Sequence, residues 1–105
     1  MHASIEQRRD EIAALCRRHG VRRLEVFGSA ARGTDFDPET SDADFLVSFE
    51  RPSGADWFKQ DFDLAEALTG LLGRPVDLVS RQAVETSRNY IRRRHILGEA
   101  QALYG

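Results

Sequence analysis

The sequence predicts a single α+β domain, in which helices pack against a small mixed sheet of three or so strands. Length is the first reason, because 105 residues and 11.9 kDa leave room for one domain over residues 1–105. The second reason is the order of the local patterns, which runs helix, strand, short helix, strand, helix, strand, helix. The third is composition, since 41% hydrophobic residues can supply one core for this layered arrangement.

The first half of the chain predicts one long helix, a short strand and a helical turn. Ile5, Ile12 and Cys16 recur on one side of a helix, and Gly20 follows its expected end. A short apolar run then leads into the Gly28-Ser29 pair, and a stretch rich in turn-forming residues follows. The expected elements are a helix over residues 5–19, a strand over 24–27, a helical turn over 29–32 and a loop over 34–41.

The second half predicts two strands and two helices. Alternation over residues 42–49 places Ala43 and every second residue after it on one apolar face, and Asp42 and Asp44 on the other. The next helix carries an apolar stripe that includes Phe58 and Phe62, which are expected in the core. The remaining elements are that helix, over residues 57–72, a strand over 76–79, and a helix over 82–103 with a break near 87–89.

Composition and charge exclude several classes of protein. The net charge of −2 and the pI of about 5.9 argue against strong binding to nucleic acid, which depends on neutralising phosphates. Cys16 is the single cysteine, so neither an internal disulfide nor a cysteine-rich metal cluster is expected. No apolar run is long enough for a membrane span, and the first ten residues lack the apolar core of a secretory signal. We therefore expect a cytoplasmic protein without membrane contact.

The segment from Gly28 to Asp44 carries the chemistry. A Gly28-Ser29 turn that enters a short helix offers backbone N–H groups and a hydroxyl to a phosphate chain. Asp42 and Asp44 lie on one side of the following strand, at its start, where alternate carboxylates can share divalent cations. Two metal ions can clamp the attacking and leaving oxygens of a phosphoryl transfer. Alone, an Asp-x-Asp pair is common in loops and caps, so the combination with Gly-Ser is the informative feature.

Asp77 is the best candidate for a third carboxylate. It interrupts an otherwise apolar strand, where a charge is unfavourable unless it is paired or bound to metal. In the site it would bind the second metal and help deprotonate the acceptor hydroxyl. The alternative is a charge on an edge strand that faces solvent.

For each of three other sets of charged residues, the sequence allows both a functional and a structural interpretation. Arg32 either contacts phosphate or pairs with a carboxylate in the loop. Arg88 and His95 could be imagined as a ribonuclease-like pair, although a solvated helix face is the simpler reading. The arginines of 92–94 form either part of a partner surface or an exposed face.

With these residues in view, the chain resembles the minimal nucleotidyltransferases of the DNA polymerase beta superfamily. The resemblance covers nearly the whole chain and implies the polymerase-beta-like palm fold. A supportive match is the tail, which resembles the closing helix of the family. The specific matches are Val-Phe-Gly-Ser-Ala-Ala-Arg-Gly at 26–33, Ser-Asp-Ala-Asp-Phe-Leu-Val at 41–47 and Val-Asp-Leu-Val at 76–79.

The resemblance also implies roles for individual residues. It implies two Mg²⁺ ions at Asp42, Asp44 and Asp77, and it implies that Gly28 and Ser29 hold the triphosphate of ATP, with Arg32 as a further nucleotide-binding candidate. There are two departures from the family pattern. Ala30 stands where members often have arginine, and the twelve residues between Ser29 and Asp42 are more than is common.

Many chains of this minimal family act beside a helical HEPN-family ribonuclease toxin, as its antitoxin. The resemblance therefore implies transfer of AMP from ATP to a tyrosine hydroxyl of such a toxin, within a hetero-oligomer. A second hypothesis is a binding module that neutralises its partner by occlusion and has a weak or inactive nucleotide site. A third, ranked lower, is a nucleotidyltransferase that modifies a small molecule such as an antibiotic.

Overall fold

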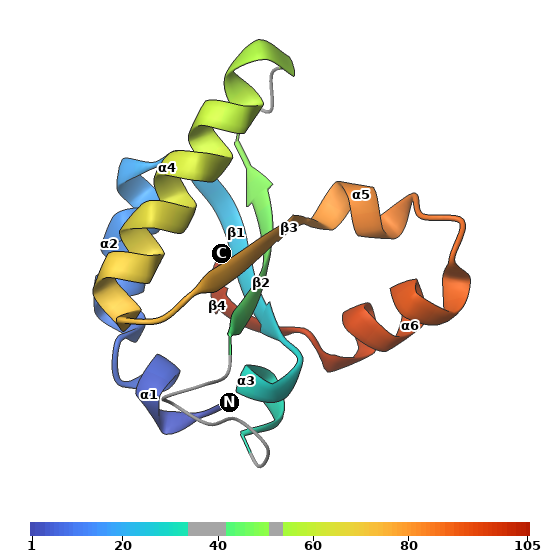
Figure 1. Cartoon of the computed structure of the whole chain (residues 1–105), viewed down its shortest axis with the longest axis horizontal. Helices are drawn as coiled ribbons and strands as arrows, with labels where there is room; N and C mark the ends of the chain where they lie inside the picture. Colours follow the sequence, from blue (N-terminus) through green and yellow to red (C-terminus); the bar gives the residue numbers. More distant parts are fainter. Residues whose placement is uncertain (34–41, 51–53) are drawn as a thin grey trace.

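A computed structural model describes residues 1–33, 42–50 and 54–105, with side chains described for all of these except 54–57. Within these ranges the chain forms a mixed sheet with strand order β3-β2-β1-β4 (Figure 1). β2 pairs antiparallel with β1 and parallel with β3, while β4 pairs antiparallel with the other side of β1. The predicted α+β class with a mixed sheet is confirmed. The strands are β1 (Val21–Phe27), β2 (Ala43–Phe49), β3 (Val76–Ser80) and β4 (Gln101–Tyr104).

Helices cover both faces of this sheet (Figure 1). The larger core lies on the face covered by α1 (Ala3–Glu6), α2 (Arg9–Arg18) and α4 (Gly54–Leu72). As the alternation predicts, the apolar side chains of β2 point into this core. Those fully or almost fully buried there include Ala43, Phe45, Val47, Phe49, Ile5, Ile12, Leu64 and Leu68.

A smaller core closes the opposite face of the sheet. Here α5 (Arg81–Glu85) and α6 (Tyr90–Glu99) contribute Val84 and Ile96, which pack with Phe27 and Leu46 of the sheet. This packing holds α6 over the end of β1, where the chain turns through Gly28 into α3 (Ser29–Arg32). The predicted short helix at 29–32 is therefore confirmed.

Two predicted helices differ from the structure. The helix expected over residues 5–19 is two helices, α1 and α2, and α1 is capped by the side chain of His2, which accepts from the Ser4 N–H at 3.1 Å. The helix expected over 82–103 stops at Glu99, and Gln101–Tyr104 form β4 instead. The unpaired edge of β1 supplies backbone partners for this segment, and Leu103 is buried against the larger core. Tertiary pairing thus overrides a helical pattern.

The predicted apolar stripe of the long helix is also wrong in part. Phe58 is 75% exposed and Phe62 is 61% exposed, whereas Leu64 and Leu68 are completely buried. The buried face of α4 therefore runs through Leu64 and Leu68, and the aromatic pair lies outside it. The apolar stripe of α4 is broad and contains both leucines and phenylalanines, so the sequence pattern does not show which of these side chains face the sheet.

The loop predicted at 34–41 lies outside the described residues. In the ranges that the structure does describe, no helix combines the length and apolar character needed to cross a membrane.

Candidate active site

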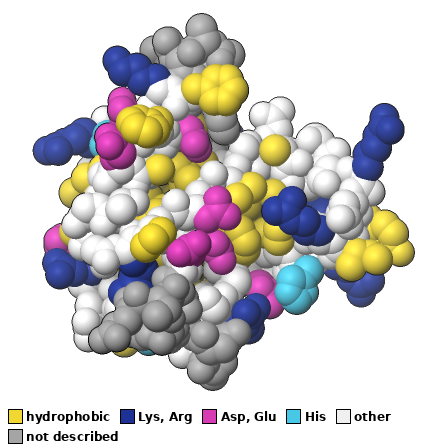
Figure 2. All heavy atoms as spheres, viewed as in Figure 1, with side chains coloured by type: hydrophobic (Ala, Val, Ile, Leu, Met, Phe, Trp, Pro, Cys, Tyr) yellow, Lys and Arg dark blue, Asp and Glu magenta, His cyan; other side chains and the backbone are white. Residues whose placement is uncertain are grey.

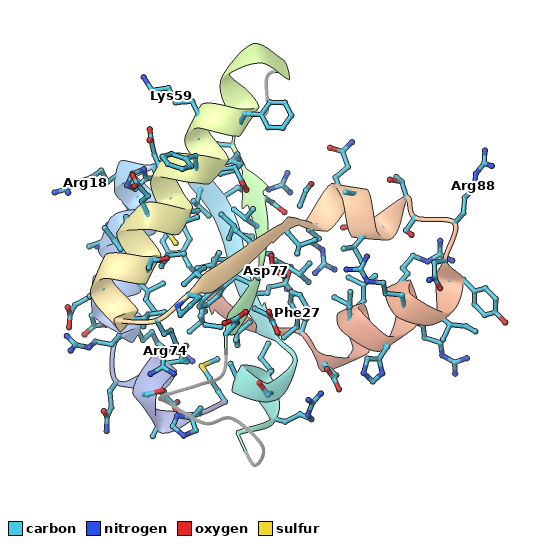
Figure 3. The ribbon with its side chains drawn as sticks, in the orientation of Figure 1. Arg18, Phe27, Lys59, Arg74, Asp77 and Arg88 are labelled. Carbon is cyan, nitrogen blue, oxygen red and sulfur yellow. The ribbon has the colours of Figure 1, made fainter. Side chains whose placement is uncertain are left out.

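The sheet places two of the predicted carboxylates side by side. Asp44 of β2 is the register partner of Phe27 on β1 and of Asp77 on β3, so these three residues form one row across the sheet. Neighbouring strands lie about 4.8 Å apart, which puts the two carboxylates within reach of a common ligand. Figure 3 shows Asp77 beside Phe27 near the middle of the molecule. The third predicted carboxylate, Asp42, is exposed and directly precedes β2.

The acidic side chains in this part of the sheet affect one another electrostatically. The pKa of Asp44 is raised from 3.8 to about 6, first by burial and then by the negative charges of Asp77 and Asp42, while the charge of Arg32 lowers it. Asp61 of α4 has its pKa raised by burial and by the charge of Asp77. The site thus concentrates negative charge, as the acidic cluster at the centre of Figure 2 shows. Such a cluster favours a cation.

Gly28 is required by the shape of this corner. Its backbone has φ +70° and ψ −150°, a conformation that side chains with a Cβ rarely adopt. A Cβ placed there would lie 2.7 Å from Oδ2 of Asp44. The glycine therefore lets the turn approach the carboxylate, which brings the predicted phosphate-binding turn and the predicted metal ligand together.

The turn after Gly28 is short and tightly bonded. The carbonyl of Gly28 accepts from the N–H groups of Ala31 and Arg32, at 3.1 Å each. Ala30 and Ala31 are buried in the larger core, so Ser29 and Arg32 are the residues of α3 that line the open side. Ala30, one of the departures from the family pattern, is thus a core residue in this chain.

A cleft of about 420 Å³ opens in front of these residues. Its wall on the sheet side contains Gly28, Ser29 and Arg32 together with Asp44 and Asp77. The facing wall belongs to α6 and consists of Arg92, His95, Ile96 and Glu99. Of the site residues predicted from sequence, all except Asp42 line this cleft.

Helix α6 supplies the part of the site that sequence analysis missed. Glu99 accepts from Arg32 Nη1 at 2.7 Å, and His95 Nε2 lies 3.3 Å from the same oxygen, Oε1. Among the described residues, Arg32 thus pairs with a carboxylate of α6, while the loop carboxylates considered above lie outside the described residues. A helical tail rich in arginine gives no signal of this contact, because the contact depends on how α6 packs against the sheet.

The other candidate pair does not form. Arg88 is exposed, lies before the start of α6, and points away from Asp77 at the far end of the α5–α6 connection (Figure 3). His95 instead lines the cleft and pairs with Glu99. The ribonuclease-like reading of Arg88 and His95 therefore has no support in this geometry.

The donor set is chemically suited to Mg²⁺, which prefers carboxylate oxygens and usually takes only one or two carboxylates beside substrate phosphates. Across the described ranges, no group of three His, Cys, Asp or Glu side chains is placed to hold a metal by itself. The register pair Asp44 and Asp77, with Asp42 close enough to affect the pKa of Asp44, fits a site that a nucleotide would complete.

Comparisons with known proteins agree with this geometry. The profile of the nucleotidyltransferase domain family matches residues 10–100. The protein adenylyltransferase MntA of Thermococcus cleftensis is 42% identical over 73 residues, which are 69% of this chain and 68% of MntA.

Solved structures show the same architecture. A protein assigned as a minimal nucleotidyltransferase superposes with a TM-score of 0.72 at 38% identity, covering 96% of this chain and 95% of its own. The MNT antitoxin complex with tri-AMPylated Shewanella oneidensis HEPN toxin matches with a TM-score of 0.61 at 19% identity, over 95% of this chain and 71% of that one. At 19% identity, the similarity to this antitoxin shows a shared fold.

Proposed function

Because the chain belongs to the nucleotidyltransferase domain family, we propose that it transfers AMP from ATP to a hydroxyl of a partner protein. The proposed partner is a helical HEPN-family toxin, for which this chain is the antitoxin, in a hetero-oligomer within the cytoplasm. The observation that carries the proposal is the row of Asp44 and Asp77 beside the Gly28 turn, facing a cleft of about 420 Å³. The similarity to a protein adenylyltransferase supports the choice of AMP and of a protein acceptor.

In this proposal each element of the cleft has a role. Gly28 and Ser29, with Arg32, hold the triphosphate, and Asp42, Asp44 and Asp77 would hold Mg²⁺. When bound, Mg²⁺ neutralises charge on the phosphate oxygens. The acceptor oxygen bonds to the α-phosphorus while the bond from that phosphorus to the bridging oxygen breaks, and pyrophosphate leaves. Asp77, which is exposed at the mouth of the cleft, receives the hydroxyl proton and returns it to solvent.

The test uses ATP labelled at two different phosphates. The purified chain is incubated with Mg²⁺, ATP and the product of the neighbouring gene, and protein-bound label is measured. We expect label from α-labelled ATP and none from γ-labelled ATP, because AMP is retained and pyrophosphate leaves. Absence of label from both, under conditions in which the two proteins associate, would contradict the proposal.

A second candidate is neutralisation by occlusion, with a weak or inactive nucleotide site. Ala30, where family members often have arginine, and the twelve residues between Ser29 and Asp42 favour it. The variant Asp42→Asn with Asp44→Asn separates the two candidates. Neutralisation of the partner at an unchanged dose would support occlusion, whereas loss of neutralisation with retained association would support catalysis.

A further inference from the structure

The α6 wall of the cleft carries two basic side chains, Arg92 and His95, to which the proposed transfer assigns no role. Resting on that proposed function, we infer that Arg92 and His95 bind the β- and γ-phosphates of the nucleotide, and therefore the pyrophosphate that leaves. Both side chains line the same cleft as Gly28 and Asp44. They come from a segment more than forty residues after β2, so their position here depends on the fold and not on a local motif.

The charges of the cleft require cationic groups for a polyphosphate. The carboxylates of Asp44 and Asp77, which line the cleft, repel phosphate oxygens by their charge. Among the described residues, those that line the cleft with basic side chains are Arg32, Arg92 and His95. Arginine forms strong charge-assisted hydrogen bonds with phosphate oxygens, and a protonated histidine donates from both ring nitrogens, so that one can serve a carboxylate and the other a phosphate. The α6 wall therefore suits the distal phosphates.

Arg92 is available for such a bond. Throughout the described ranges its guanidinium makes no hydrogen bond or ion pair, while its backbone N–H donates to the Asn89 side chain at 3.1 Å and caps the helix. Its neighbour Arg93 differs, because Arg93 Nη1 donates to the carbonyl of Ser87 at 2.8 Å. An unpaired guanidinium at the wall of a cleft favours an anionic ligand.

Glu99 explains how His95 and Arg32 are held in position. One oxygen, Oε1, lies 2.7 Å from Arg32 Nη1 and 3.3 Å from His95 Nε2, so a single carboxylate orients basic side chains from two helices. An acidic residue in a phosphate-binding cleft would be unfavourable if it were alone. Here its charge is compensated, and Glu99 acts as a positioning residue for both neighbours.

The experiment compares binding of ATP, inorganic pyrophosphate and AMP by Arg92→Ala, His95→Ala and wild type, using calorimetry in the presence of Mg²⁺. Arg94→Ala is the matched control, because Arg94 is an exposed arginine of the same helix that does not line the cleft. Thermal unfolding of each variant checks that the fold is retained. Arg92→Gln gives a second variant that keeps most of the side-chain volume.

We expect each cleft variant to weaken binding of ATP and pyrophosphate by about tenfold, the usual loss for one charge-assisted hydrogen bond, and binding of AMP by less than about twofold. Arg94→Ala should leave all three unchanged. Equal effects of Arg92→Ala and Arg94→Ala, or an equal loss for AMP and ATP, would overturn the inference. Because binding is measured without an acceptor, a chain that binds as expected but transfers no AMP would contradict the proposed function alone.

Discussion

Among single residues, Asp44 is the one for which folding and the proposed chemistry favour different protonation states. Burial and the charges of Asp77 and Asp42 raise the pKa of its carboxyl to about 6, which means that the folded protein disfavours the charged form. Metal binding requires that charged form. The site therefore holds a carboxylate that destabilises the free protein near neutral pH and is available to a cation.

The first prediction concerns the stability of Asp44→Asn in Mg²⁺-free buffer. Since the pKa of Asp44 is about 6 when folded and close to 3.8 when unfolded, wild type loses stability as the pH rises through this window. The variant should therefore be more stable by roughly 1 kcal/mol at pH 7.5, a value reduced for solvent screening of a half-exposed group. The gain should disappear by about pH 3.5, where the aspartate is neutral in both states.

Urea unfolding at several pH values measures this difference. The control is Asp63→Asn, on α4 and away from the cleft, for which we expect a change within about 0.5 kcal/mol. A variant less stable than wild type at pH 7.5, or a gain that does not depend on pH, would contradict the electrostatic account of the site.

Gly28→Ala is the second prediction at this scale. The positive φ of Gly28 and the 2.7 Å approach of a Cβ to Asp44 Oδ2 should destabilise the fold by about 1–3 kcal/mol and displace the carboxylate. AMP transfer should fall by more than the loss of folded protein explains. Gly70→Ala is the matched control, because Gly70 lies inside α4 with open space around it and alanine should stabilise the helix by about 0.5–1 kcal/mol. Similar behaviour of the two variants would refute the special role of Gly28.

At the scale of elements, α4 presents an aromatic pair to solvent. Phe62→Ser should change the free energy of unfolding by less than about 0.5 kcal/mol, because Phe62 is 61% exposed. Leu64→Ala, two residues further along the same helix, should cost about 3 kcal/mol, since Leu64 is completely buried. Chemical denaturation of both variants measures the contrast. A loss of several kcal/mol for Phe62→Ser would mean that the helix is rotated from the orientation described.

The attachment of α5 gives a second prediction at this scale. Glu25 of β1 is only 3% exposed and is paired with Arg81 of α5 and, at 3.4 Å, with Arg23. Arg81→Met should cost about 2–3 kcal/mol, because it removes the main partner of a buried charge. Arg8→Met, which breaks the exposed pair with Glu11, should cost less than about 0.5 kcal/mol. Equal losses in thermal unfolding would show that the Glu25 pair does not anchor α5.

The elements that the sequence predicted correctly are those with local signals. Alternation predicted which side of β2 faces the core, and the Gly28-Ser29 pair predicted the turn into α3. β4 was missed because its four residues pair with β1 across more than seventy residues of chain, and no local pattern reports that pairing. Phe58 and Phe62 of α4 were wrongly predicted to be buried, because the helical period shows that an apolar stripe exists but not how far the buried face extends.

At the scale of the whole molecule, the sheet converts motifs that are distant in sequence into one site. The spacing of Asp42 and Asp44 predicted one half of the acidic cluster, and the odd charge in an apolar strand predicted Asp77 as the other. The roles of these residues stay predictions. The α6 wall with Arg92, His95 and Glu99 could not be predicted, because it arises when Ile96 packs against Phe27 in the smaller core.

In the function proposed above, the Gly28 turn and the row of Asp44 and Asp77 together form a site for Mg²⁺ and a nucleoside triphosphate. The most direct measurement is calorimetric titration of the chain with a non-hydrolysable ATP analogue, with and without Mg²⁺, for wild type and Asp44→Asn. Wild type should bind the analogue more tightly with Mg²⁺ than without it, by about tenfold or more in affinity, and Asp44→Asn should lose most of this dependence. An affinity that changes neither with Mg²⁺ nor with Asp44→Asn would rule out a nucleotide and metal site at this row of residues.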